Sequence, residues 1–415
     1  MSIRGSVQLR KHYEMPGANT ATLLVVALYP FLPLLREWNA SLGTVVELVA
    51  VLLLVAIVFV KAAKGEFSLS VVIAFALISL FLLMYCLVGC LAGAEVYEAV
   101  SGFRSIYLPF LVLLSLGSGG GWSRISRTMP KVVIFVALCM SIGCIVQFVL
   151  PDIVKSLHNP SAWDALRDKT DWIPLSEYNR ALSFMNDPNI LSVLLCSALF
   201  VVVDSVRGFH LVDKKLVLLI VVIVLGIILT RSRTGLILMA MYAILSFAFF
   251  LRSKKIKPVW ILALVIGAFL AMYFAMTFTD EIVSYMRVDT LLTGNGRFDN
   301  NVLHYELLSE NLPVFLFGHG LFDGRSITFE NSYLLCLYMF GIVGLSIFSI
   351  LSFVLCRPFI GKNPVSVLCC GAALFVGDYI LIPQISIYML IWLMVPPSGR
   401  REGDGVDVLE SCQRA

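Results

Sequence analysis

Charged side chains are scarce in this chain of 415 residues: Asp, Glu, Lys and Arg together make up 14% of it, against about 25% in an average soluble protein. Hydrophobic residues rise to 59%, where about 45–50% is usual. A water-soluble domain cannot bury so large an apolar fraction. A disordered chain or a nucleic-acid-binding module needs far more charge. The composition therefore excludes these classes, and no nucleic acid is expected as a partner.

Cysteine motifs are missing as well. The ten cysteines include no CxxC pair and no spacing with His that is typical of zinc sites. All but Cys412 fall within apolar blocks, where buried structural thiols are the expected interpretation. No internal repeat is visible, so a transporter built from inverted repeats gains no support. A disulfide scaffold and a zinc module are excluded, and we expect no metal and no cofactor.

Apolar blocks of about 15–25 residues dominate the chain, which is the length needed to cross about 30 Å of hydrocarbon. The sequence therefore predicts an all-α polytopic membrane protein, a single integral membrane domain over 1–415 with about twelve transmembrane helices. The expected spans are 20–35, 43–61, 68–91, 105–117, 131–150, 189–205, 215–230, 235–251, 259–279, 331–356, 364–382 and 384–396. The first run lacks a convincing cleavage site, and we expect it to act as a signal anchor.

The distribution of basic residues predicts the orientation. With both termini cytoplasmic, the inner loops hold 20 of the 31 Lys and Arg residues, as the positive-inside rule requires. Two long loops, about 151–188 and 280–330, then lie outside. The outer face holds 11 basic residues, of which nine are Arg. Arg grips phosphate or carboxylate with two parallel hydrogen bonds, so this bias suggests anion binding rather than simple solubility.

Three outside features are predicted helix starts, and each supplies free N–H groups and a positive dipole end. Before the sixth span, Arg180 is followed by Asp187, a good N-cap, and by Pro188 and Asn189. The eighth span opens with Arg231 to Gly235, which includes Arg233 and two candidate caps, Ser232 and Thr234. The tenth opens with Glu330 and Asn331. Several such ends around one cavity would suit a diphosphate.

Each of these residues also has a plainer interpretation. Arg180 could simply extend to the membrane interface, and Arg233 could be structural, although a charge between two apolar spans is expensive. Arg231 is expected to support its neighbour. Asp187 suits a cap better than a catalyst. His319, in Gly-His-Gly, is more typical of a loop histidine than of a base.

The second long loop carries Gly294-Asn-Gly296-Arg297, followed by apolar residues at helical spacing. This pattern predicts a short amphipathic helix that ends before Leu312-Pro313. Arg297 would stand at its start, where an ordinary solvated turn is the alternative.

The order of these features resembles the bacterial O-antigen ligase/polymerase superfamily of lipid-linked glycosyltransferases, over about residues 95–356. In chain order the features are an outside Arg180, Pro188-Asn189 at a span start, Ser232-Arg-Thr-Gly235, Gly296-Arg297, Phe317-Gly-x-Gly320, and x-Asn331-x-Tyr-Leu334 followed by Gly341-Ile-Val-Gly-Leu345.

The resemblance implies a metal-independent enzyme at the periplasmic face of the bacterial inner membrane. Its substrate would be an undecaprenyl-diphosphate-linked oligosaccharide, and its partners the lipid bilayer and a chain-length regulator protein. Ligases of this superfamily typically carry His before the conserved Asn, where this chain has Glu330. The departure favours the O-antigen (Wzy-type) polymerase branch over transfer to lipid A core.

In such a polymerase, Arg180 and Arg233, helped by Arg104 and Arg297, would stabilise the leaving diphosphate. Glu330 would accept the proton of the acceptor hydroxyl. Further candidate substrate-binding residues are Arg231, Asn189, Asn331 and His319. A ligase or a polytopic transporter or flippase remains the alternative. A transporter would be expected to place more charge in mid-span than the two residues identified there, Glu47 and Asp378.

Overall fold

The computed structural model describes residues 16–117, 122–159, 181–185, 187–206, 214–252, 308, 311–322, 331–359, 364–376 and 379–394. Over these ranges the secondary structure is helical, with no strand. Six helices are long and apolar enough to cross a membrane: 19–38, 40–63, 69–91, 96–116, 128–149 and 332–356. An all-α membrane protein is therefore confirmed.

The helices differ in length much more than the predicted spans do. In chain order they are α1 (Pro16–Leu28), the 3₁₀ turn η1 (Tyr29–Phe31), α2 (Leu32–Trp38), α3 (Ala40–Ala63), α4 (Leu69–Leu91), α5 (Val96–Leu116), α6 (Trp122–Val149), α7 (Pro151–Leu157), α9 (Pro188–Val206), α10 (Lys214–Leu229), α11 (Arg233–Arg252), α16 (Leu312–Phe317), α17 (Ser332–Cys356), α18 (Pro364–Val376), the 3₁₀ turn η3 (Tyr379–Leu381) and α19 (Pro383–Met394).

Several predicted boundaries were wrong, and the fourth span shows why. The helix begins at Val96, whereas the predicted span began at 105. The prediction left out its first half because Glu98 and Arg104 lower the hydropathy there. Those charges are tolerated because much of α5 is buried inside the protein rather than facing lipid. The predicted span 364–382 is also interrupted, since α18 ends at Val376. The predicted span 259–279 lies outside the described residues.

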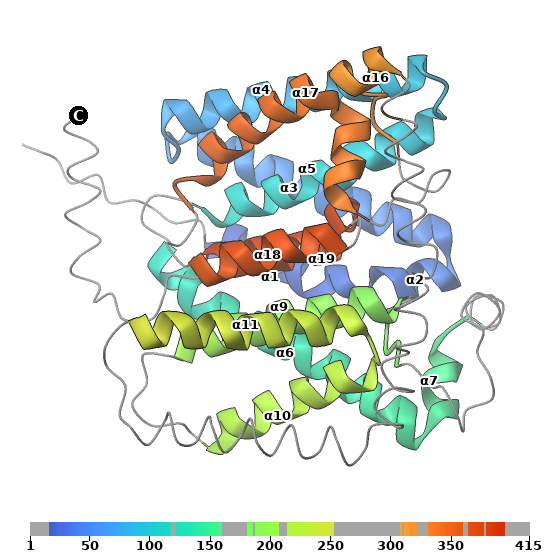
Figure 1. Ribbon diagram of the computed structural model, residues 1–415, viewed down its shortest axis with the longest axis vertical. Helices are drawn as coiled ribbons and strands as arrows, with labels where there is room; N and C mark the ends of the chain where they lie inside the picture. Colours follow the sequence, from blue (N-terminus) through green and yellow to red (C-terminus); the bar gives the residue numbers. More distant parts are fainter. Residues whose placement is uncertain are drawn as a thin grey trace, which may run out of the picture.

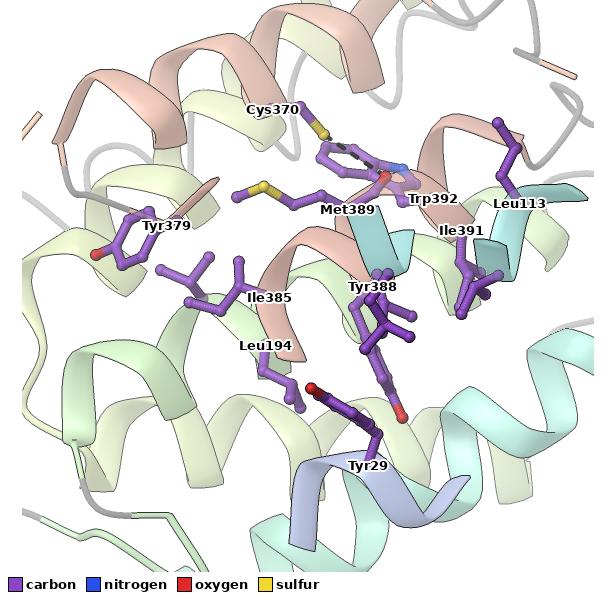
Figure 2. Packing of buried hydrophobic residues seen from close by; sticks show 14 of the residues in the cluster. Tyr29, Leu113, Leu194, Cys370, Tyr379, Ile385, Tyr388, Met389, Ile391 and Trp392 are labelled. Atoms are coloured by element: carbon purple, nitrogen blue, oxygen red, sulfur yellow. Dashed lines mark hydrogen bonds between the residues drawn. The ribbon is translucent and has the colours of Figure 1, made fainter. Parts of the chain in front are cut away.

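The short helix α19 is a core helix rather than a lipid-facing one. Nine of its twelve residues are buried, and it packs against α5 and α9. In Figure 2 the side chains of Ile385, Tyr388, Ile391 and Trp392 leave this helix in different directions and are surrounded by other side chains. A helix that is apolar on every side is stable only when protein covers it all round. Its first turn, as described below, reaches the candidate site.

Helix α17 is bent at Gly341, whose φ of 64° and ψ of 177° are far from helical values. Figure 1 shows its two segments at a steep angle to each other. The three carbonyls before the bend accept hydrogen bonds from outside the helix. The N–H of His319 donates to the carbonyl of Tyr338 (2.8 Å), and the N–H of Gly320 donates to the carbonyl of Met339 (3.0 Å). The Tyr85 hydroxyl donates to the carbonyl of Phe340 (2.9 Å). The Gly318-His-Gly320 segment is thus part of the bend.

The predicted outside connections gather at one end of the helix bundle, here named the Arg36 end. Arg104 of α5 pairs with Glu47 of α3. The Trp38 indole donates to the carbonyl of Leu157, and the N–H of Ala181 donates to the carbonyl of Leu229. Figure 1 places α2 and α7 together on the right of the bundle.

Two of the predicted inside connections, those that follow α3 and α5, meet at the opposite, Lys61 end. There the buried Lys61 ammonium donates to the carbonyl of Ser115, at 2.6 Å. The prediction that alternate connections share an end is therefore confirmed for these segments, while the assignment of the Arg36 end to the periplasm stays a prediction.

Candidate functional site

A cavity of about 420 Å³ opens at the Arg36 end. Six parts of the chain line it: the η1 turn, α2, the start of α3, the first half of α5, the turn into α9, and the η3–α19 junction. Most of the polar groups that line the cavity come from the first four, whereas Met185, Ile190 and Ile382 supply apolar walls and Gln384 an amide. Its size is within the range of small-molecule pockets.

Glu47 is the centre of the charge arrangement in this cavity. It is only 1% exposed. It accepts hydrogen bonds from Arg36 and from the hydroxyl of Tyr29, and it forms an ion pair with Arg104. A buried carboxylate needs such partners, because desolvation alone would strongly oppose its charge. The interpretation of Glu47 as a mid-span charge was wrong, since it lies in the second turn of α3, level with Arg36.

The local sequence explains how Arg36 reaches Glu47. Asn39 ends α2 and caps α3 by accepting from the N–H of Leu42, at 2.9 Å, so the chain reverses between the two helices. Arg36 then passes over the first turn of α3 at Gly43. A Cβ at position 43 would lie 2.3 Å from the Cγ of Arg36, so a side chain there would displace Arg36.

Arg104 approaches Glu47 from the other side, with Nη1 at 2.7 Å. Its Nη2 also donates to the Ser101 hydroxyl, one turn earlier in α5, at 3.1 Å. The guanidinium is therefore held by two residues. Its Nε is buried and has no hydrogen-bond partner within the described residues.

A second pair, the buried His158 and the largely buried Glu37, borders the same cavity through Glu37. His158 Nδ1 lies 2.7 Å from a Glu37 carboxylate oxygen and Nε2 lies 2.8 Å from the Ser183 carbonyl. Burial alone would lower the pKa of His158, but the hydrogen bonds from Glu37 and Ser183 and the charge of Glu37 outweigh it and raise the pKa. Both ring nitrogens face acceptors, as the doubly protonated ring requires.

The predicted helix start at Asp187 is confirmed. Its carboxylate accepts from the N–H groups of Asn189 (2.5 Å) and Ile190 (3.2 Å), and Pro188 is the first residue of α9. Asn189 then accepts from the Ser232 hydroxyl, at 3.0 Å. This bond joins the start of α9, which borders the cavity at Ile190, to the start of α11.

The α10–α11 connection is shorter than predicted, because α11 begins at Arg233 itself. Ser232 is the capping residue, with its hydroxyl 3.5 Å from the N–H of Gly235. Arg231 forms the turn and has a φ of 49°, and its role in supporting Arg233 stays a prediction. Arg233 is thus placed at the Arg36 end, one residue from the Asn189 contact.

The start of α17 gives a different result for the two residues predicted there. Asn331 is the N-cap, since its side chain accepts from the N–H groups of Tyr333 (2.8 Å) and Leu334 (3.4 Å). Glu330 lies outside the described residues. Ser332 accepts from the N–H of Ile380, at 3.3 Å, so this helix start is adjacent to the η3 turn that borders the cavity.

His319 lies in the bend of α17 rather than among the cavity-lining residues. Its ring stacks on that of Tyr338, with centroids 5.1 Å apart. The predicted amphipathic helix after Arg297 lies almost wholly outside the described residues and stays a prediction. A separate helix, α16, spans Leu312–Phe317 and begins under an Asn311 cap. Proline is compatible with this first helical turn.

Arg180 and Arg297 also lie outside the described residues. Within the ranges described above, no three His, Cys, Asp or Glu side chains cluster as metal ligands would, and the absence of a metal requirement stays a prediction. The nine cysteines of the described chain are free thiols, seven of them buried.

Sequence reasoning missed four residues of this site: Arg36, Glu37, Glu47 and His158. A signal existed for three of them. Arg36-Glu37 interrupts two apolar blocks, and Glu47 is an acidic residue within an apolar run, so each charge needed a partner. The pairing itself could not be predicted, because it depends on how α2, α3 and α5 pack.

Compared with known proteins, the chain matches no family model, no curated protein and no solved structure.

Proposed function

We propose that this protein is a polysaccharide polymerase of the O-antigen type. It joins undecaprenyl-diphosphate-linked oligosaccharide repeats at the periplasmic face of the bacterial inner membrane. It belongs, on this proposal, to the O-antigen ligase/polymerase superfamily, with both termini in the cytoplasm, about twelve spans and outer loops over 151–188 and 280–330.

One observation carries the proposal. The helix starts that the sequence singled out, at Asn189, Arg233 and Asn331, lie at the same end of the bundle as a cavity that contains Arg36 and Arg104. A lipid-linked diphosphate needs an arrangement of this kind: cationic groups and free N–H groups at the level where the helices end.

The reaction transfers the growing chain from one lipid carrier to the next repeat. A hydroxyl of the incoming lipid-linked repeat attacks the anomeric carbon of the growing chain. The bond from that carbon to the diphosphate oxygen breaks, and its electron pair stays on the diphosphate. Arg180, Arg233 and Arg104 stabilise the developing negative charge. The hydroxyl proton passes to Glu330, which stands directly before the cap of α17.

The test is the lipopolysaccharide banding pattern of a deletion strain. A polymerase deletion should leave core plus one repeat and no longer bands. Bare core with accumulated lipid-linked polymer would instead identify a ligase. Loss of all repeats, with no accumulated polymer outside the cell membrane, would indicate a flippase. Either result would overturn the proposal.

Complementation of that strain tests the arginines. Arg233→Ala should abolish long chains at matched membrane abundance, and Arg233→Lys should restore them poorly, because lysine returns the charge without the planar fork. Arg180→Ala and Arg180→Lys should give the same results as the corresponding Arg233 variants. Arg357→Ala, at an exposed position on the Lys61 end, is the matched control and should complement fully. Full activity of both Arg233 variants would leave that residue structural.

A further inference from the structure

The turn over residues 181–185 is buried although it is neither helix nor strand. Ala181, Leu182, Ser183 and Met185 are each at most 1% exposed, and Met185 lines the cavity. Buried backbone N–H and C=O groups need hydrogen-bond partners, and a turn supplies few of its own. The partners of this turn must therefore come from side chains or from other elements.

One side chain supplies two of these bonds. Gln147, which is buried near the end of α6, accepts from the N–H of Leu182 at 2.9 Å and from the N–H of Ser183 at 3.0 Å. Both bonds end on its Oε1, whose two lone pairs allow them to form together. Two successive peptide groups of the turn are thereby fixed on α6.

The carbonyl of Ser183 is held by a different residue, His158, whose Nε2 lies 2.8 Å from it. Ser183 has a φ of 52°, which is unfavourable for a residue with a side chain and persists only where its surroundings enforce it. Gly143 of α6 makes room for it, because a Cβ at position 143 would overlap the Ser183 hydroxyl. The contacts of Gln147 and His158 with the turn are here named the Ser183 clamp.

The clamped turn connects the two segments that carry the arginines proposed for the diphosphate. Ala181, which directly follows Arg180 in the chain, donates its N–H to the carbonyl of Leu229 at 3.0 Å. Leu229 is the last residue of α10, and the short turn that follows it leads to Arg233 at the start of α11. The clamp therefore fixes the residue after Arg180 against the connection that leads to Arg233.

We propose that Gln147 and His158 are positioning residues of the transfer reaction, which hold the 181–185 turn and thereby set the spacing of the segments that carry Arg180 and Arg233. The inference rests on the proposed function and adds two residues that do not line the cavity. Two arginines stabilise one developing charge only when they are placed in advance. A displacement of about 1 Å can lower a rate by about a hundredfold, so a clamp on this turn has a kinetic effect without touching the substrate.

The experiment measures polymerisation by the purified full-length protein over a range of concentrations of a lipid-linked repeat. Gln147→Met keeps the length of the side chain but leaves two buried N–H groups without their acceptor. We expect kcat per folded protein to fall by about tenfold or more while KM changes by less than about threefold, because the arginines remain but are misplaced in the transition state. Gln147→Glu keeps an acceptor oxygen and should restore most of kcat. Wild-type kcat for Gln147→Met, or equal losses for both variants, would overturn the inference.

Tyr242→Phe is the matched control for lost stability. It removes one buried hydrogen bond, to Asp204, in the middle of α11 and away from the clamp. Its kcat per folded protein should equal that of the wild type even if its melting temperature falls as far as that of Gln147→Met. A kcat that falls in parallel with the melting temperature in both variants would show that Gln147 is only structural.

The part of His158 is tested by combining variants. His158→Phe cannot donate to the Ser183 carbonyl and should lower kcat as Gln147→Met does. Because both residues act on one turn, the double variant should lose little more than either single variant. Losses that multiply would show that the two residues act on separate features, and the shared clamp would be wrong. If His158→Phe fails to fold, His158→Asn replaces it.

A measurement without substrate separates this inference from the proposed function. Amide hydrogen exchange over residues 181–185 should be at least about tenfold faster in Gln147→Met than in the wild type. If it is faster but the deletion strain lacks the polymerase banding, the polymerase proposal fails and the clamp stands without a role in sugar transfer. If the banding identifies a polymerase but Gln147→Met changes neither exchange nor kcat, only this inference fails.

Discussion

Glu330 is the residue whose substitution tests the proposed chemistry most directly. Asn331 caps α17, so Glu330 does not have to act as the cap. Glu330→Gln should therefore lose most polymer, because the amide cannot take a proton although its shape is nearly the same. Glu330→Asp should retain part of the activity. Chain-length banding at matched expression measures both, and wild-type polymer from Glu330→Gln would move the base elsewhere, with His319 the next residue to examine.

Glu47 has a structural consequence that can be measured without substrate. Removing its charge leaves Arg36 and Arg104 without a buried counter-charge, though both are partly exposed and can recruit water. We expect Glu47→Gln to lower the free energy of unfolding by about 1–3 kcal/mol. Glu95→Gln should change it by less than about 0.5 kcal/mol. Thermal unfolding in detergent compares the two, and equal stability would show that the charge cluster contributes nothing to folding.

His158 should make stability depend on pH in a defined direction. The pKa of this histidine is raised in the folded protein. Its contribution to the free energy of unfolding is therefore fully present below the unfolded-state pKa of about 6.5. That contribution is lost as pH rises through the higher folded-state pKa. The stability difference between wild type and His158→Asn should therefore shrink between mildly acidic and alkaline pH. A difference that grows with pH would contradict the protonated-histidine assignment.

At the scale of elements, the bend of α17 depends on one residue. Gly341 has a φ of 64°, and a Cβ there would lie 2.4 Å from the backbone of α16. Gly341→Ala should therefore destabilise the protein by more than about 1–2 kcal/mol and separate the Gly-His-Gly segment from α17. Gly371→Ala is the control, because its new Cβ would meet only the Tyr333 hydroxyl at 3.5 Å. Equal melting temperatures for the two variants would contradict this account.

Elements that follow from local rules were predictable, and those that follow from packing were not. Asp187 and Pro188 determine the start of α9 through capping, which sequence alone reveals. Hydropathy gave the long spans α3, α4 and α6. The bend at Gly341 depends on donors from α4 and from the 318–320 segment. The Glu47 cluster likewise joins α2, α3 and α5, so neither could be derived from a single stretch of sequence.

For the whole molecule, the orientation is the premise of the proposed function. Reporter fusions at Lys169, Arg207, Lys255 and Asp323 should be outside, inside, inside and outside, respectively. Ala181, which follows the loop of Lys169, and Ser332, which follows the loop of Asp323, both lie at the Arg36 end. Any reversal among the four would separate the arginines onto two membrane faces, and a diphosphate site could not then be assembled from them.

The central position of α19 bears on how the molecule is made. This helix follows every other described helix in the chain, yet it is enclosed by α5 and α9, which are synthesised long before it (Figure 1). The surfaces of α5 and α9 that will receive α19 must first be covered by lipid or by each other, because their partner does not yet exist. Lipid tails solvate leucine as well as protein does, so this waiting state is tolerable in a bilayer. The cavity, which Gln384 helps to line, is therefore completed only in the last step of assembly, and an unfinished chain in the membrane has no complete site.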